Sequence, residues 1–232
     1  MTILGIIPAR GGSKGVPRKN IKLLGGKPLL QYTSEVALKS KYISKLIVSS
    51  EDDEIIEVAK SIGIEVPFKR PDHLALDSSP TLPVIIHALE FYKQKNIFFD
   101  AVCLLQTTSP FRTVAFLNKA IEIFMDKGTD SLFSTREVPH EYNPHWVFEE
   151  KEDKTLQIVT GEKEVISRRQ DLPKVFHRDG SIYITKASVL MKQKSLFGQS
   201  ISHIESPKIN HVNIDTLKDW KKAEKIILKS FN

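Results

Sequence analysis

The apolar run Ile3-Leu-Gly-Ile-Ile-Pro8 leads directly into the stretch Ala9-Arg-Gly-Gly-Ser-Lys-Gly-Val-Pro-Arg-Lys-Asn20. A short apolar run followed by turn residues is typical of a strand buried on both faces, as in a parallel sheet. The glycine-rich loop, residues 8–20, is then expected at the carboxyl end of that strand. In open α/β sheets, ligands bind outside the carboxyl ends of the strands. This segment therefore predicts both the fold class and the place of a binding site.

Strand and helix patterns alternate from residue 3 to about residue 135. Helices are expected where apolar residues recur at helical spacing behind a start signal, such as Pro28 or the acidic turn Asp52-Asp-Glu54. Such alternation predicts a parallel sheet with right-handed crossovers. The expected strands are 3–8, 45–50, 64–68, 100–106 and 130–135, and the expected helices begin near 28, 52, 81 and 114.

The alternation stops at Arg136, where a proline- and aromatic-rich stretch begins. Residues 147–159 mix charged and apolar side chains and predict an exposed hairpin. The region of about 137–178 is too polar to form a core of its own, so we interpret it as an inserted arm that mediates dimerisation.

Strands at 180–185 and 209–214 and a closing helix at 217–228 complete the expected elements. We expect a single domain over residues 1–232, with a doubly wound, mostly parallel α/β sheet and the inserted arm. A homodimer is the expected assembly.

Composition limits the class of protein. The 232 residues include 34 Lys and Arg against 28 Asp and Glu, a formal net charge of +6, and 41% are hydrophobic, which excludes wholesale disorder. The single cysteine, Cys103, excludes an intrachain disulfide framework and a cysteine-based zinc site. The first apolar run is too short for a membrane span or a signal-peptide core. We therefore expect a cytoplasmic protein without a membrane partner.

Basic residues crowd the glycine-rich loop and the segment behind it. Glycines allow tight turns whose N–H groups face an anion, and basic side chains add charge-assisted hydrogen bonds to phosphate oxygens. The alternative is a surface turn with solvated lysines. No Walker motif is present, because Gly26-Lys27 is followed by Pro28, and no G-x-G-x-x-G follows the first strand. The basic residues are Arg10, Lys14, Arg18, Lys19, Lys22 and Lys27.

Several segments, in order along the chain, resemble one enzyme family. Residues 7–20 closely resemble the nucleotide-binding signature of the acylneuraminate cytidylyltransferases, the CMP-sialic acid synthetases. The segment Arg70-Pro-Asp-His-Leu-Ala-Leu-Asp77 is similar to the family's second loop, and Leu104-Leu-Gln-Thr-Thr-Ser-Pro-Phe-Arg112 is similar to its Gln-Pro-Thr-Ser-Pro-Leu-Arg motif. Residues 168–173, followed by 179–184, are similar to its sugar-side segment. The resemblance implies the Rossmann-like nucleotide-diphospho-sugar transferase fold.

The resemblance also implies a reaction. The anomeric hydroxyl of a nine-carbon 2-keto sugar acid attacks the α-phosphorus of CTP, and pyrophosphate leaves. N-acetylneuraminate is the simplest acceptor, and legionaminic, pseudaminic and 3-deoxy-octulosonic acids are alternatives. A basic nucleic-acid-binding module is the competing class of function. The basic loop is glycine-rich rather than helical and the phenylalanines lie in buried-looking runs, so no nucleic-acid partner is expected.

By resemblance, Arg10 and Lys19 form a cationic clamp on the triphosphate and act in catalysis with Asp215. The segment Ser78-Ser79-Pro80-Thr81 departs from the family's usual Thr-Ala-Ser-Ser, and capping of the following helix is the alternative role for Ser79 and Thr81. The implied nucleotide contacts are Ala9, Gly11, Gly12, Ser13, Lys14, Asn20, Arg70, Ser79 and Thr81.

The implied acceptor contacts lie further along the chain. Arg168 is a suitable bidentate partner for a carboxylate, although an exposed basic pair with Arg169 is the alternative. Asp179 replaces an asparagine common in sialic acid-specific relatives and, together with His177, points to a different nonulosonic acid. Tyr183 packs under the sugar or fills the core. The full set is Gln106, Thr108, Ser109, Arg168, Gln170, Asp179 and Tyr183.

The segment Asn213-Ile214-Asp215 stands where the family typically has Asp-x-Asp before its closing helix. Alternation along a strand would point both polar side chains to the same face. The resemblance implies that Asp215 and Asn213 hold Mg²⁺, with the neutral amide weakening the site or binding through water. Capping of the closing helix is the alternative role for Asp215.

Overall fold

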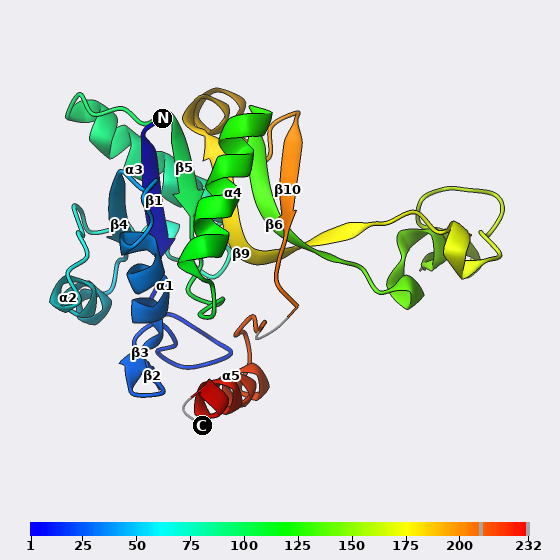
Figure 1. Ribbon diagram of the computed structural model, residues 1–232, viewed down its shortest axis with the longest axis horizontal. Coiled ribbons are helices and arrows are strands. Elements are labelled where there is room, and N and C mark those ends of the chain that lie inside the picture. The colour runs from blue at the N-terminus through cyan, green and yellow to red at the C-terminus, as the bar shows by residue number, and fades with distance from the viewer. Residues whose placement is uncertain (209–210, 231–232) are drawn as a thin grey trace. The chain divides into compact units, whose positions relative to one another are not determined.

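A six-stranded sheet organises the larger of two compact units (Figure 1). The computed structural model describes residues 1–208 and 211–230. The larger unit contains Met1–Ser134 and Gly180–Asn232, and the smaller unit, Thr135–Asp179, contains the insertion predicted at 137–178.

The sheet has the strand order β10-β6-β9-β5-β1-β4. Its strands are β1 (Ile3–Pro8), β4 (Lys45–Ser49), β5 (Ala101–Leu104), β6 (Ser131–Glu137), β9 (Phe176–Lys186) and β10 (Ile201–Glu205). β1 pairs in parallel with both β4 and β5, whereas β9 is antiparallel to β5. Because β1 lies between β4 and β5, the chain changes winding direction at β1. The carboxyl ends of β1 and β5 therefore form a topological switch point, where α/β sheets bind ligands.

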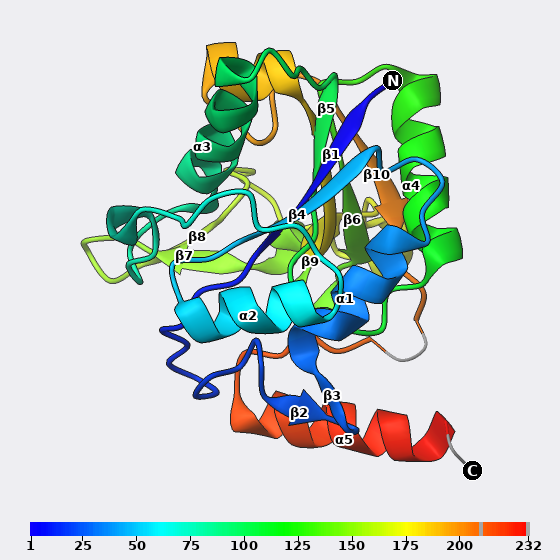
Figure 2. The ribbon, with the colours of Figure 1, turned by 90° about the vertical axis from the view of Figure 1, so that its left-hand side faces the viewer.

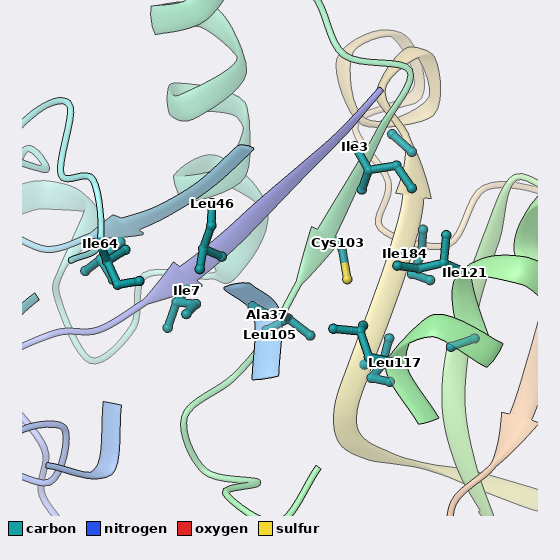
Figure 3. Close-up of a cluster of buried hydrophobic side chains, with 14 of the residues drawn as sticks. Ile3, Ile7, Ala37, Leu46, Ile64, Cys103, Leu105, Leu117, Ile121 and Ile184 are labelled. Carbon is teal, nitrogen blue, oxygen red and sulfur yellow. The ribbon is translucent and has the colours of Figure 1, made fainter. Parts of the chain in front are cut away.

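Helices cover both faces of this sheet, with α3 on one face and α4 on the other (Figure 2). Alternate residues of β1 point to the two faces of the sheet. Ile3 and Ile7 pack in a hydrophobic core cluster with residues of α1, α2 and α4, and Leu4 and Ile6 pack in a second cluster with residues of α3. Figure 3 shows Ile7, Cys103 and Leu117 in the first cluster. The helices are α1 (Leu29–Leu38), α2 (Asp53–Ser61), α3 (Thr81–Gln94), α4 (Val114–Lys127) and α5 (Leu217–Ser230), with a π-helix at Val189–Gln193.

Local signals set the helix ends. Asp52 caps α2 by accepting a hydrogen bond from the Ile55 N–H at 3.0 Å, and Thr113 caps α4 in the same way. Gly128 ends α4 in the left-handed conformation, with φ of 61°. Pro28 lies just before α1, at the end of a small hairpin formed by β2 (Leu23–Leu24) and β3 (Lys27–Pro28).

Helix α5 packs under the glycine-rich loop. Its Trp220, Ala223 and Ile227 are buried against Val16 and Leu24, as expected for the inward face of an amphipathic closing helix. Figure 2 shows α5 beside the β2–β3 hairpin. The loop consequently has a hydrophobic support on the side away from the sheet.

Two strand predictions are wrong, and one strand of the six-stranded sheet was not predicted. The extended run at 64–68 contributes a single isolated bridge, between Ile47 and Glu65. The strand expected at 209–214 is absent over 211–214, and residues 209–210 lie outside the described part of the chain. Val212 and Ile214 are buried, but the Ile214 N–H donates to the Thr108 carbonyl instead of joining a ladder. The unpredicted β10 is an edge strand with mostly exposed side chains, so it lacks a strong apolar pattern.

The smaller unit contains a hairpin of β7 (Phe148–Glu150) and β8 (Leu156–Ile158) in antiparallel register, which matches the predicted hairpin. Three short 3₁₀ turns accompany it, at His140–Tyr142, Pro144–Trp146 and Arg169–Asp171. The Trp146 indole N–H donates to the Ile166 carbonyl at 2.6 Å, and the buried Asn143 amide donates to the Pro173 carbonyl at 3.0 Å. Hydrogen bonds thus hold segments of the smaller unit together, although few of its apolar side chains are buried.

Across residues 1–208 and 211–230, no helix is long and apolar enough to cross a membrane.

Candidate active site

A cavity of about 440 Å³ opens at the carboxyl ends of β1 and β5. Its walls come from the glycine-rich loop, from the loop before α3, and from the segments that follow β5 and precede α5. The predicted site residues that line it are Arg10, Ser13, Lys14, Lys19, Asn20, Arg70, Ser79, Thr81, Gln106, Thr108, Asn213 and Asp215.

Three basic side chains of the glycine-rich loop face this cavity. Lys19 is 14% exposed; its ammonium donates to the Ile214 carbonyl at 2.7 Å and lies 3.3 Å from an Asp215 oxygen. Arg10 and Lys14 contact a different segment, the loop before α3. Cations on two walls of one cavity create a field that attracts polyphosphates.

The other basic residues of this region serve different partners, which corrects the expectation that all six act on phosphate. The Arg18 guanidinium pairs with Asp52, at the N-terminus of α2, and holds the pKa of that carboxyl below its usual range. The Lys22 ammonium lies 5.2 Å from the ring centroid of Trp220. Lys27 forms an ion pair with a carboxylate of α1.

Gly15 is required by a close approach between two segments. A Cβ at this position would lie 1.9 Å from the Asp215 carbonyl oxygen. The glycine-rich loop therefore contacts the segment before α5 backbone to backbone, and this contact brings Lys19 and Asp215 to the same end of the cavity.

Three predicted nucleotide contacts do not line the cavity. Ala9 is fully buried in the core, and Gly12 is exposed without lining the cavity. The Gly11 N–H donates to a Glu51 carboxylate oxygen at 2.7 Å, so it is already engaged and is not directed at a phosphate in the cavity. A carboxylate that follows β4 thus takes the N–H that was expected to bind phosphate.

Glu51 also holds Arg70, and it is not among the predicted site residues. Its second oxygen accepts a hydrogen bond from the Arg70 guanidinium at 2.9 Å. Both side chains are largely buried, at 16% and 4% exposed, and burial lowers the pKa of Arg70. In the sequence, the acidic residues after β4 indicated only the start of α2. The contacts of Glu51 with Gly11 and Arg70 could not be predicted from this pattern.

Asn20 joins two walls of the cavity. Its amide donates to the Arg10 carbonyl at 2.8 Å, and its oxygen accepts from the Thr107 hydroxyl at 2.7 Å. Asn20 is 4% exposed. It therefore fixes the glycine-rich loop against the segment that carries Gln106 and Thr108.

Ser79 and Thr81 line the cavity, and the capping alternative for them is wrong. Pro80 occupies the N-cap position of α3 and no side chain caps this helix. The Ser79 hydroxyl instead donates to the His73 carbonyl at 2.7 Å, within the loop before α3.

Two predicted acceptor contacts of the larger unit lie away from this cavity. Ser109 is buried and lines a separate cavity of about 260 Å³, because the chain turns after Thr108. Tyr183 is 8% exposed and packs in the core with its ring 6.0 Å from that of Phe133. The structure thus supports the core-filling alternative for Tyr183.

Three further acceptor predictions belong to the smaller unit. The Arg168 guanidinium donates to both oxygens of Asp171, at 2.7 and 3.2 Å, which is the bidentate geometry expected of it toward a carboxylate. Gln170 is exposed on the same turn, and Asp179 is 6% exposed. Their roles toward a sugar stay predictions.

Asn213 and Asp215 lie together on the cavity wall. The Asn213 amide donates to one Asp215 oxygen, while the other faces Lys19. The cap of α5 is formed by Thr216 and Asp219, whose carboxylate accepts from the Thr216 N–H at 2.9 Å, so the capping alternative for Asp215 is wrong. Within the described ranges, no three His, Cys, Asp or Glu side chains gather in a metal-binding group. The oxygen donors here are one carboxylate and one amide.

Comparison with known proteins agrees with this geometry. A family model described as Cytidylyltransferase matches residues 4–226. The pseudaminic acid cytidylyltransferase of Campylobacter jejuni is 36% identical over 229 residues, which cover 99% of this chain and 97% of the relative. The CMP-N,N'-diacetyllegionaminic acid synthase of Legionella pneumophila is 34% identical over 230 residues, 98% of this chain and 97% of the relative.

The N-acylneuraminate cytidylyltransferase A of Danio rerio is 35% identical over 228 residues, which cover 98% of this chain but 51% of that protein. Among solved structures, a CMP:2-keto-3-deoxy-manno-octonic acid synthetase complexed with CTP has a TM-score of 0.74 at 15% identity, covering 99% of this chain and 100% of the other. At that identity the similarity is one of fold, and it agrees with the predicted Rossmann-like architecture.

Proposed function

The chain belongs to the cytidylyltransferase family, and we propose that it transfers CMP from CTP to a nine-carbon 2-keto sugar acid of the pseudaminic or legionaminic type. The observation that carries this function is the cavity at the switch point, which is lined by the cations Arg10, Lys14 and Lys19 together with Asn213 and Asp215. Relatives named for pseudaminic and legionaminic acids match along almost their whole length, which favours these acceptors over N-acetylneuraminate.

The cations of the cavity would position the triphosphate and neutralise its charge. In the reaction, the anomeric hydroxyl oxygen loses its proton and bonds to the α-phosphorus, while the bond from that phosphorus to the bridging oxygen breaks. The electron pair of the broken bond leaves with pyrophosphate. Catalysis of such a step depends mainly on positioning and on electrostatic stabilisation of the developing charge. Lys19, held by the Ile214 carbonyl, is the most firmly oriented of the three cations.

The loop before α3 forms the side of the cavity suited to a base. Leu74 and Val84 provide apolar surface there, beside Arg70 and the polar groups of Ser79 and Thr81. A flat heterocycle needs apolar walls and a few fixed hydrogen-bonding groups for orientation. We assign cytosine to this side and phosphate to the side of the glycine-rich loop.

A Mg²⁺ ion fits the pair formed by Asp215 and Asn213. Mg²⁺ in nucleotide sites is held by one or two carboxylates together with phosphate oxygens and water, so one carboxylate and one amide oxygen suffice as protein ligands. Asp215 is 59% exposed and lines the cavity, and a bound ion would replace the Asn213 N–H beside one of its oxygens. When bound, the ion would neutralise charge on the phosphates. Asp215→Asn should lower turnover at saturating Mg²⁺ by about 10²-fold or more, and turnover near that of the wild type would remove Asp215 from this role.

The acceptor is tested by mixing the purified protein and CTP with a panel of sugar acids and measuring pyrophosphate release. We expect the highest kcat/KM with pseudaminic or legionaminic acid, and lower values with N-acetylneuraminate and 3-deoxy-octulosonate. UTP in place of CTP is the matched nucleotide control. If no sugar acid in the panel releases pyrophosphate from CTP, the proposed function is wrong. If N-acetylneuraminate is the best acceptor, the proposed acceptor class is wrong and the reaction stands.

We propose a homodimer assembled through the smaller unit. This unit exposes several large apolar side chains, including Tyr142 at 67%, Leu156 at 63% and Phe148 at 45%. Exposed apolar surface of this kind marks interaction sites. Sedimentation at micromolar concentration should give twice the 26.3 kDa mass of the chain, and a monomer would contradict the assembly.

We also propose a cytoplasmic location, supported by the one cysteine of the chain, Cys103, which is buried as a free thiol. Fractionation of cells that produce the protein would test this, since recovery outside the cytoplasm contradicts it.

A further inference from the structure

Asp77, at the end of the loop before α3, lies between two cations of the glycine-rich loop. One of its oxygens is 2.9 Å from the Arg10 guanidinium and the other is 2.6 Å from the Lys14 ammonium. Arg10 also donates to the neighbouring Leu76 carbonyl at 2.9 Å. A single carboxylate with two oxygens thus engages the same two side chains that would receive phosphate oxygens.

The ion pairs of Asp77 differ in their exposure from the pair between Arg70 and Glu51. Asp77 is 42% exposed, Arg10 is 34% exposed and Lys14 is 80% exposed. In contrast, the pair between Arg70 and Glu51 is almost fully buried. Half-exposed ion pairs contribute little stability and exchange readily, whereas breaking a buried pair is costly. Arg10 and Lys14 are therefore the cations that can change partner, and Arg70 is not.

We propose that Asp77 is a stand-in anion for the phosphate chain: it competes with CTP for Arg10 and Lys14, and it takes these two cations back as pyrophosphate leaves. This inference rests on the proposed function, because it assigns the same cations to the triphosphate. Lys14 and Arg10 hold the pKa of the Asp77 carboxyl below its usual range, so the competing group is charged at neutral pH.

The competition lowers the affinity of the site for polyphosphates. A polyphosphate offers several negative charges to two cations, so it displaces one carboxylate, and part of its binding free energy is spent on breaking the two ion pairs. After transfer, Asp77 can pair with Arg10 and Lys14 again, and this competition weakens the binding of pyrophosphate to the site. Asp77 thus weakens the binding of both the substrate triphosphate and the leaving product, and it favours release of the product.

The test is direct binding by calorimetry of inorganic pyrophosphate and of CTP to the wild type and to Asp77→Asn, at low ionic strength. Asparagine keeps the shape and removes the charge. Two half-exposed ion pairs correspond to an expected fall in Kd of about three- to tenfold for both ligands. The difference should shrink at high salt, because exposed charges are screened. Asp77→Glu restores the charge and should return Kd toward that of the wild type.

The matched control is Asp53→Asn on α2. Asp53 pairs with Lys69 at 2.6 Å, lies on the surface away from the cavity lining, and changes the net charge by the same amount. Its Kd values should equal those of the wild type. Equal tightening in both variants would attribute the effect to net charge and overturn the inference.

An unchanged or higher Kd for Asp77→Asn would also overturn it, because a carboxylate that only ties the two loops together would loosen the site when removed. A wild type that binds neither pyrophosphate nor CTP would instead refute the proposed function. The two failures are therefore distinguishable in one set of titrations.

Discussion

Replacing Gly15 by alanine tests the contact on which the candidate site depends. Neither Gly15 nor its neighbour Gly12 has a positive φ, so alanine is compatible with the backbone at both positions. The two positions differ in space: a Cβ at Gly15 would meet the Asp215 carbonyl oxygen at 1.9 Å, whereas a Cβ at Gly12 has no heavy atom within 4 Å. Gly12→Ala is therefore a matched control that adds the same methyl group without the clash.

The magnitude follows from this overlap. Ordinary carbon–oxygen contacts are no shorter than about 3.3 Å, so the two backbone segments must separate by roughly 1.4 Å. Overpacking of this kind costs about 1–3 kcal/mol, which for a chain of this size lowers Tm by roughly 2–12 °C. The separation also moves Lys19 away from Asp215, and a displacement of about 1 Å in a catalytic group can reduce turnover by about 10²-fold. Gly12→Ala should stay within about 0.5 kcal/mol of the wild type.

The assay combines thermal unfolding with CTP binding and with pyrophosphate release from CTP and the best acceptor. Gly15→Ala should have a lower Tm, a weaker affinity for CTP and a lower kcat than the wild type. Gly12→Ala should keep all three values near those of the wild type. If Gly15→Ala has the Tm and CTP affinity of Gly12→Ala, the close approach of the loop to Asp215 does not support the site and the argument is refuted.

Further predictions concern charge and burial. Asn213→Asp adds a second carboxylate beside Asp215 and should lower the Mg²⁺ concentration that gives half-maximal activity; a titration with an unchanged midpoint would contradict the assigned metal pair. Glu51→Gln leaves the buried Arg70 charge without its carboxylate and should cost about 3 kcal/mol of stability in urea unfolding, so a wild-type midpoint would show that the pair is not needed. Burial raises the pKa of the Cys103 thiol from 9.0 to about 12. The folded thiol stays protonated between these values while the unfolded thiol ionises, so its contribution to stability is complete below pH 9 and falls as pH rises, by up to about 1.4 kcal/mol per pH unit. The pH dependence of the unfolding free energy of Cys103→Ala should lack this part of the slope, and identical slopes would contradict it.

Elements with strong local signals could be predicted from the sequence. The apolar run of β1 and the acidic cap of α2 depend on neighbours within a few residues, and both were correctly expected. The edge strand β10 could not be predicted in the same way, because its exposed side chains carry little apolar pattern. At Val212 and Ile214 the pattern correctly indicated burial, but the backbone partner is the Thr108 carbonyl rather than a neighbouring strand.

The motifs located the site, yet they did not assign a partner to each charge. Arg18 and Lys22 are basic and lie within three residues of Lys19 in the sequence. However, Arg18 pairs with Asp52, and Lys22 lies over the ring of Trp220. Both partners lie far away along the chain, and a local pattern holds no information about them. The same reason explains why Glu51, whose carboxylate accepts a hydrogen bond from the Gly11 N–H, is not among the predicted site residues.

The fold class, the family and the identity of the loop that faces the ligand could all be read from the sequence, because they depend on periodicity and on motifs that are contiguous in the chain. Tertiary structure decided which side chains of those motifs meet. It brought Gly15 against Asp215, placed Asp77 between Arg10 and Lys14, and buried Tyr183 in the core. The physical reason is that ion pairs and close contacts depend on distances in space, which are set by the packing of the sheet and its helices and not by separation along the chain.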